Sequence, residues 1–238
     1  MIEPFVKRIV HNYFGLIFQI FVAFVTTLVF IRTIGISGYA IMGITFSFLE
    51  VVFLFDIPFF LALVRFNRAS LMQDMALFSR MVNTLLMMVL LSGFAIAIML
   101  IPVIYFLSKL IYHDVSLLAY FGIGLLIIQL LRIIKFLNEL VRANEHETIV
   151  QRANTMFIAL EFVIVLCLLF ILKLGVLSIF LSTLIARAVQ LMILIHSIKK
   201  KRIVHFQPYF SKVLFMKALK ESAFQNHLTR ILRGLLFS

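Results

Sequence analysis

The chain has 238 residues, of which 63% are hydrophobic and only 13% are charged. A soluble domain is about 45–50% apolar, so this composition excludes an ordinary water-soluble protein and indicates a membrane protein with several spans. The net charge of +12 would suggest a nucleic-acid partner in a soluble protein. In a membrane protein, basic residues instead gather in cytoplasmic loops, and we expect no nucleic-acid binding.

Six apolar runs follow one another along the chain, each near the ~20 residues that span a bilayer. The runs cover residues 12–31, 39–64, 81–107, 115–131, 155–172 and 174–198. They are continuous rather than alternating, which predicts helices and not the strands of a membrane barrel. The first is too long for a signal peptide, so we interpret it as a retained helix. The predicted fold class is all-α, a bundle of six transmembrane helices over residues 1–202.

Basic residues are distributed unevenly between the two ends of these spans. Thirteen lie at the end that holds the N-terminus, and three lie at the other end. The first group is Lys7, Arg8, Arg65, Arg68, Arg80, Arg132, Lys135, Arg142, Arg152, Lys199, Lys200, Lys201 and Arg202; the second is Arg32, Lys109 and Lys173. Because cytoplasmic loops are rich in Lys and Arg, the N-terminus and the end of the sixth span are predicted to face the cytoplasm.

Residues 203–238 differ from the six spans. From Phe210 to Leu219, lysines lie among apolar residues, which predicts an amphipathic helix at the membrane interface. Another apolar run begins near Leu235, so we expect this segment to lead into a second, truncated lobe. The basic run 199–202 is interpreted as the anchor of the sixth helix at the membrane surface.

Three segments carry short motifs in a fixed order. FIRTIGISGYAIMG (30–43) joins Arg32 to Tyr39 by a short turn, LFDIPFFLALVRF (54–66) contains Asp56, and LVRANEHETIVQRANTMFIALEF (140–162) leads into the fifth run. Together they resemble polysaccharide exporters of the O-antigen flippase (Wzx) type, in the multidrug/oligosaccharidyl-lipid/polysaccharide (MOP) flippase superfamily. Ala40 and Pro58 stand where that family usually has glycine. Its members usually have two six-helix lobes, and this chain corresponds to the N-terminal one.

Several spans carry polar residues on one helix face, at spacings of three, four or seven. Such sets are Gln19 with Thr26, Glu50 with Gly43 and Ser47, Asn154 with Glu161, and Thr183 with Arg187 and Gln190. Polar side chains in a membrane either join helices or face a water-filled path. Arg187 lies near the middle of its span, where an arginine costs about 2.5–3.5 kcal/mol. It is therefore expected either to form a buried ion pair with Glu161 or Glu50, or to face a cavity.

The resemblance implies a function: flipping of an undecaprenyl-pyrophosphate-linked oligosaccharide across the bacterial inner membrane by alternating access. It makes Arg187 a ligand for pyrophosphate oxygens, which a guanidinium binds in bidentate fashion. The expected cavity-lining residues are Arg187, Glu50, Glu161, Gln19, Gln190 and Thr183, and the expected gating or ion-coupling residues are Asp56, Pro58 and Arg32. The implied partners are the lipid-linked oligosaccharide, membrane lipid, the polysaccharide polymerase with its chain-length machinery, and a second copy of the chain.

An alternative is a half-size or truncated membrane protein that does not transport and acts as a scaffold in polysaccharide assembly. The sequence has no P-loop and no cluster at metal-ligand spacing, so we expect neither an enzyme nor a cofactor or metal site. The single cysteine, Cys167, lies in an apolar run and is predicted to pack in the core.

Overall fold

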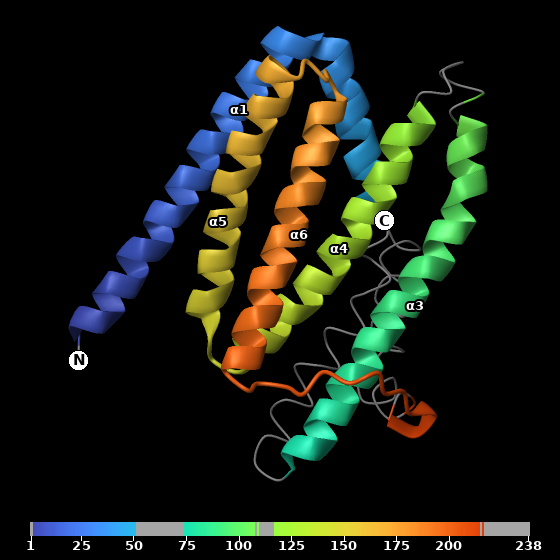
Figure 1. Cartoon of the computed structure of the whole chain (residues 1–238). Coiled ribbons are helices and arrows are strands. Elements are labelled where there is room, and N and C mark those ends of the chain that lie inside the picture. Colours follow the sequence, from blue (N-terminus) through green and yellow to red (C-terminus); the bar gives the residue numbers. More distant parts are fainter. Residues whose placement is uncertain (1, 51–73, 108, 110–116, 215, 217–238) are drawn as a thin grey trace, which may run out of the picture.

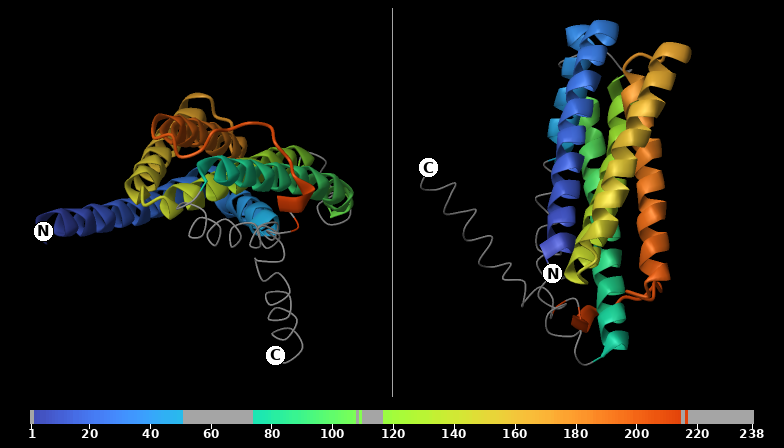
Figure 2. Two further views of the ribbon diagram at one scale, coloured as in Figure 1. Left: turned by 90° about the horizontal axis from the view of Figure 1, so that it is seen from below. Right: turned by 90° about the vertical axis from the view of Figure 1, so that its left-hand side faces the viewer.

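The computed structural model describes residues 2–50, 74–107, 109, 117–214 and 216. Within this part of the chain, five helices are long and apolar enough to cross a membrane. They are α1 (Ile2–Glu50), α3 (Met75–Leu107), α4 (Leu117–Ala143), α5 (Glu147–Leu166), which continues as a π-helical turn (Cys167–Ile171), and α6 (Leu177–Lys200). The helices lie side by side in one bundle (Figures 1 and 2).

Helix α1 consists of two limbs joined at Gly35, where the backbone has φ 76° and ψ 170°. Glycine reaches this region readily because it has no Cβ, and other residues essentially do not. The chain turns there and runs back (Figure 1), so the limbs correspond to the first predicted span and the start of the second. Residues 51–64 of that second span lie outside the described residues, and a sixth span therefore stays a prediction.

Helices α4 and α6 form the centre of the bundle. In the most apolar window of α4, 50% of the residues are buried, compared with 11% in the window of α1. The outer faces of α1 and α3 instead carry exposed side chains such as Phe24, Ile98 and Met99. An apolar surface of this extent is typical of helices that contact lipid.

The connection between α4 and α5 is much shorter than the sequence suggested. We predicted that the fourth span ends at residue 131 and the fifth begins at 155, but α4 continues to Ala143 and α5 begins at Glu147. Arg132, Lys135 and Arg142 therefore belong to α4 rather than to a loop, and Arg152 belongs to α5. The prediction was wrong because it ended the helix at its first charge, whereas arginine and lysine are good helix formers.

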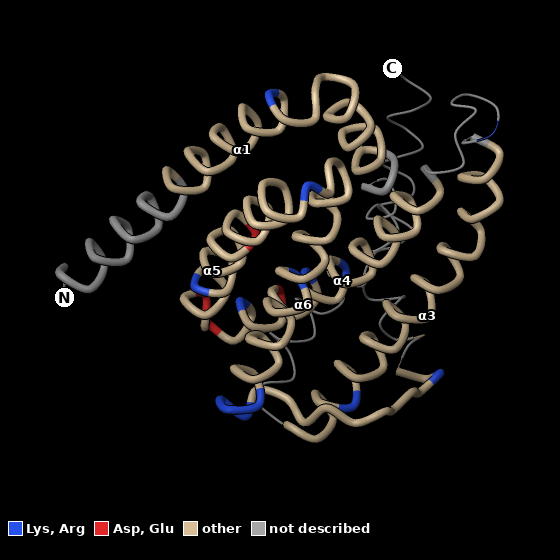
Figure 3. Tube along the Cα trace, turned by 45° about the horizontal axis from the view of Figure 1, so that its top comes forward, with Lys and Arg blue, Asp and Glu red and all other residues tan. Residues whose placement is uncertain are grey.

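Helices α4 and α6 end in the same way, without glycine. Glu145 has φ 63° and Arg202 has φ 52°, and each follows the last helical turn. In the two turns, the N–H groups of His146 and Ile203 donate to carbonyls five residues earlier, at 3.1 and 3.2 Å. This pattern satisfies carbonyl groups that a helix end leaves unpaired. In Figure 3, blue basic segments gather where α6 ends and α3 begins.

The chain after α6 does not continue as a helix. Residues 203–211 form an extended strap that crosses the first turns of α3, and helical structure resumes only at Lys212. Ile203 and Val204 are buried in a cluster with Phe78 and Met81 of α3, so apolar burial holds the strap down. The predicted helix from Phe210 therefore begins two residues late, and its part beyond residue 216 lies outside the described residues.

Cys167 is also placed differently from the prediction. Its side chain is exposed at the start of the π-helical turn, not packed in the core. An apolar run cannot distinguish the core face of a membrane helix from its lipid face, because both are apolar.

Candidate functional site

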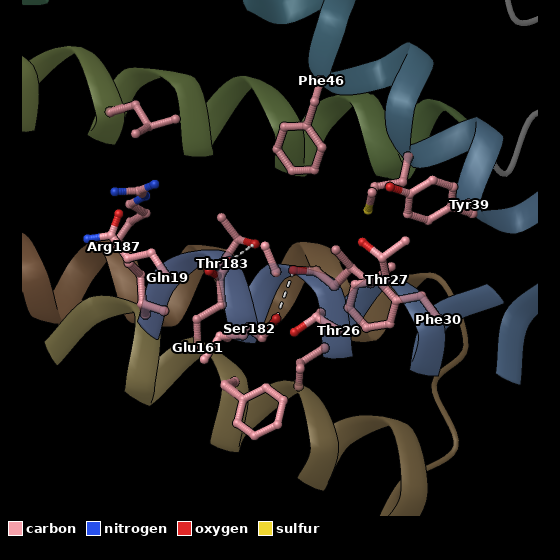
Figure 4. A pocket seen from close by; sticks show the side chains of 18 residues that line it. Gln19, Thr26, Thr27, Phe30, Tyr39, Phe46, Glu161, Ser182, Thr183 and Arg187 are labelled. Carbon is pink, nitrogen blue, oxygen red and sulfur yellow. Dashed lines mark hydrogen bonds between the residues drawn. The ribbon is translucent and has the colours of Figure 1, made fainter. Parts of the chain in front are cut away.

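A pocket of about 510 Å³ lies between the two limbs of α1 and the helices α5 and α6 (Figure 4). Its polar lining residues are Gln19, Thr26, Thr27, Tyr39, Glu161, Ser182, Thr183 and Arg187. Phe30, Phe46 and Phe162 add aromatic surface. In Figure 4, Arg187 and Gln19 lie at one end, Tyr39 and Phe30 at the other, and Glu161 with Thr183 between them. The turn at Gly35 makes this pocket possible, because it brings both limbs of α1 to the same side of α5 and α6.

Glu161 and Thr183 join α5 to α6 inside the pocket. The Thr183 hydroxyl donates to Oε1 of Glu161 at 2.5 Å. Thr183 also lies one helical turn before Arg187, so both side chains project from the same face of α6. The pocket therefore contains a carboxyl group and a guanidinium at positions set by two packed helices.

Arg187 is fixed by groups on two sides. Its Nη1 donates to Oε1 of Gln190 at 2.8 Å, and its guanidinium carbon lies 3.5 Å from the ring centroid of Phe157. Gln190 is itself held, since its Nε2 donates to Oδ1 of Asn154 at 2.6 Å. Asn154, Gln190 and Arg187 thus form a continuous hydrogen-bonded chain from α5 to the pocket wall. The Nε atom of Arg187 is buried and has no hydrogen-bond partner.

The energies of these contacts explain how α6 holds a charge near its middle. Arg187 is ten residues from Leu177, which is about 15 Å along the helix axis, half the thickness of the hydrocarbon core. A cation–π contact contributes about 0.5–2 kcal/mol and a hydrogen bond to a charged group about 1.5–3 kcal/mol. Together these offset the ~2.5–3.5 kcal/mol insertion cost of arginine without an ion pair.

The expected ion pair between Arg187 and Glu161 is not formed. Each side chain bonds to a neutral partner instead, Gln190 in one case and Thr183 in the other. The pairing with Glu50 is untested, because Glu50 is the last residue of α1 and its side chain lies outside the described residues. Of the two expectations for Arg187, the structure favours the one in which it faces a cavity.

The remaining predicted residues fall into three groups. Gln19, Glu161, Thr183 and Arg187 line one pocket, whereas Gln190 lies behind Arg187 and is 1% exposed. Arg32 is exposed in α1, three residues before the turn at Gly35, and is not among the residues lining the pocket. Asp56 and Pro58 lie outside the described residues.

Sequence reasoning missed a second polar cluster, between α3 and α4. Arg132 is fully buried; its Nη2 donates to the Ser92 hydroxyl at 2.7 Å and its Nη1 to Oε1 of Gln129 at 3.2 Å. Gln129 donates to the carbonyl oxygen of Gly93 at 2.9 Å. The spacing of Gln129 and Arg132 by three residues was a usable signal, but it was overlooked because Arg132 was assigned to a loop.

The whole described fold resembles that of solved membrane transporters. A mutant of the Vibrio cholerae MATE transporter VcmN superposes with a TM-score of 0.71 at 17% sequence identity, covering 87% of this chain and 49% of that one. A multidrug resistance MATE family transporter of the MOP superfamily, in an outward-facing conformation, superposes with a TM-score of 0.68 at 17% identity, covering 88% of this chain and 49% of that one. This chain spans about half the length of these transporters.

Neither a protein-family model nor a curated protein matches the sequence. At 17% identity, the two structures establish the fold and not the substrate. The fold of the described residues is therefore the one seen in these two MATE transporters.

Proposed function

We propose that this chain is a membrane transport protein of the bacterial inner membrane, with the pocket between α1, α5 and α6 as its substrate site. The fold that this chain shares with MATE transporters supports a role in transport. The observation that carries the proposal is Arg187, a mid-span cation held by Phe157 and Gln190 at the wall of a pocket. Polar and charged groups inside membrane spans mark substrate or ion paths.

The proposed substrate is a lipid-linked oligosaccharide that carries pyrophosphate. The Arg187 guanidinium, which lines the pocket, would bind phosphate oxygens. The hydroxyl groups of Thr26, Thr27 and Ser182 would bind sugar hydroxyls. A volume of about 510 Å³ lies within the ~300–1,000 Å³ of small-molecule sites, which suits a head group and leaves the lipid tail in the bilayer.

A flipping assay tests this proposal. The full chain is reconstituted in proteoliposomes with a fluorescent undecaprenyl-pyrophosphate oligosaccharide in one leaflet, and its arrival in the other leaflet is followed by a membrane-impermeant quencher. Arg187→Gln is expected to lower the initial rate about thirtyfold, equivalent to roughly 2 kcal/mol for the lost charged hydrogen bonds. Arg142→Gln is the control, since Arg142 is an exposed arginine at the end of α4 that bonds Glu139 at 2.8 Å.

Equal rates for wild type and Arg187→Gln would remove Arg187 from the substrate site. No flipping by the wild type, together with capture of a polysaccharide polymerase from the same membrane, would favour the scaffold instead. That outcome leaves the fold unchanged but assigns the pocket no transport role.

A further inference from the structure

A second pocket, of about 530 Å³, lies at the other end of the molecule from the turn at Gly35. One wall is the face of the first turns of α3, and the other is the strap that follows α6. Its lining residues are Met75, Ala76, Ser79, Arg80, Asn83, His205, Gln207 and Tyr209. The strap contributes every second residue, as expected for an extended chain that presents one face to its neighbour.

Two side chains of α3 that line this pocket, Ser79 and Asn83, anchor the backbone of the strap. Nδ2 of Asn83 donates to the carbonyl oxygen of His205 at 2.8 Å, and the N–H of His205 donates to Oγ of Ser79 at 3.3 Å. Burial of Ile203 and Val204 adds apolar contact. The imidazole of His205 and the guanidinium of Arg80 are exposed and take no part in these bonds. The pocket is therefore a built feature, and the side chains of Arg80 and His205 are available to a ligand.

The described residues that line the pocket are rich in hydrogen-bond donors and include no carboxylate. Arg80, Gln207 and Tyr209 can all donate, and the Arg80 guanidinium carbon lies 5.8 Å from the Tyr209 ring centroid. The acidic residue next to the pocket, Asp74, caps α3, since its Oδ1 accepts from the N–H groups of Ala76 and Leu77 at 2.9 and 3.2 Å. The four basic residues 199–202 end only three positions before His205 and increase the positive potential.

The segment after the strap indicates contact with membrane. Phe210, Val213 and Met216 are 49%, 77% and 44% exposed, at spacings of three residues, with Lys212 between them. Exposed apolar residues mixed with lysine are typical of segments that lie in the membrane interface. The pocket thus lies where a spanning helix has just ended, at the depth of lipid head groups.

We propose that the pocket formed by the start of α3 and the strap 203–211 binds the phosphate of an anionic membrane lipid. Arg80 supplies the charge, and His205, Gln207 and Tyr209 supply further hydrogen bonds. A lipid bound there would tie the strap to α3 and to the bilayer together. This inference does not depend on the substrate proposed for the pocket at Arg187, and the two sites share no residue.

A titration of the purified full chain tests the proposal, with short-chain phosphatidylglycerol as the probe and native mass spectrometry as the readout. We expect saturable binding that Arg80→Gln weakens roughly tenfold. His205→Gln should weaken it less and leave the strap in place, because the strap bonds through the His205 backbone. Arg142→Gln removes an exposed arginine elsewhere and should have no effect. Circular dichroism and thermal unfolding confirm that each variant is folded.

Four results would overturn the proposal. Equal binding by folded Arg80→Gln would exclude this pocket as the site. Equal weakening by Arg142→Gln would indicate diffuse attraction between charged surfaces. Glycerol phosphate binding as tightly as the lipid would keep a phosphate site but reject a lipid as its ligand, and equal affinity for phosphatidylcholine would reject the requirement for an anionic lipid.

Discussion

Two arginines in neighbouring helices, Arg132 of α4 and Arg187 of α6, occupy contrasting environments. Arg132 is fully enclosed and donates to Ser92 and Gln129 between α3 and α4. Arg187 is held on one side by Phe157 and Gln190, and its other side lines a pocket. The same side chain in the same kind of helix thus joins helices in one place and faces a cavity in the other. The packing around each arginine decides between these roles.

The largest expected loss of stability comes from adding a side chain at Gly93, beside the enclosed Arg132. A Cβ added there would lie 1.9 Å from Oε1 of Gln129 and 2.4 Å from Nη1 of Arg132. Because Arg132 is fully buried, neither group can move aside without breaking its hydrogen bonds. We expect Gly93→Ala to lower the free energy of unfolding by about 3 kcal/mol, from overpacking plus lost bonds.

Reversible unfolding in mixed micelles measures this effect. Gly122→Ala is the matched control, because a Cβ at Gly122 of α4 has no atom within 4 Å. That control should be neutral or slightly stabilising, since alanine is the better helix former. Equal stabilities for the two variants would mean that α3 and α4 do not approach each other as closely as described.

The next prediction compares the two arginines directly. Arg132→Met is expected to lower the free energy of unfolding by about 2 kcal/mol, because it leaves the partly buried polar groups of Ser92 and Gln129 with fewer partners. Arg187→Met should change it by less than about 1 kcal/mol, since the lost bond to Gln190 is offset by removing a charge from the span. The same unfolding assay measures both variants. A larger loss of unfolding free energy for Arg187→Met than for Arg132→Met would show that Arg187 is the arginine that joins the helices.

A third prediction concerns the chain of bonds behind Arg187. Gln190→Leu should destabilise the protein by about 1.5 kcal/mol, because the partly buried Asn154 side chain then loses its hydrogen-bond partner. Adding Asn154→Leu to Gln190→Leu should not lower the free energy of unfolding by the same amount again, because neither partner of the hydrogen bond is then left unpaired. The double-mutant cycle should therefore give a coupling of about 1 kcal/mol. Additive losses would show that the two side chains act independently.

These contrasts also mark how far the sequence could be used alone. Helical spans and polar faces were predictable, because they follow from apolar content and from spacings of three and four residues. Four of the six residues predicted to line a cavity, Gln19, Glu161, Thr183 and Arg187, lie around one pocket, and their role in binding stays a prediction. The turn at Gly35 also falls between two predicted spans.

The partners of the charged groups could not be predicted. A helical pattern shows that Arg187 and Glu161 both face inward, but not that Gln190 and Thr183 are nearer than the opposite charge. Arg132 was assigned to a loop because a single charge lowers local hydropathy. The sequence does not show that α3 supplies the Ser92 hydroxyl to Arg132 and the Gly93 carbonyl to Gln129 across the interface. The strap 203–211 depends on contacts with α3 that are more than 120 residues apart along the chain.

The smallest expected loss of stability concerns the pocket that Arg187 lines, at the hydrogen bond between Thr183 and Glu161. Thr183→Val keeps the shape of the side chain and removes the hydroxyl that donates to Glu161, so it should lower the free energy of unfolding by about 1 kcal/mol. Thr183→Ser keeps the hydroxyl and serves as the control. If the bond mainly positions Glu161 for a ligand, Thr183→Val should also weaken substrate binding more than Thr183→Ser does. A loss of stability without any change in binding would make this pair, like Arg132 with Ser92, a joint between helices.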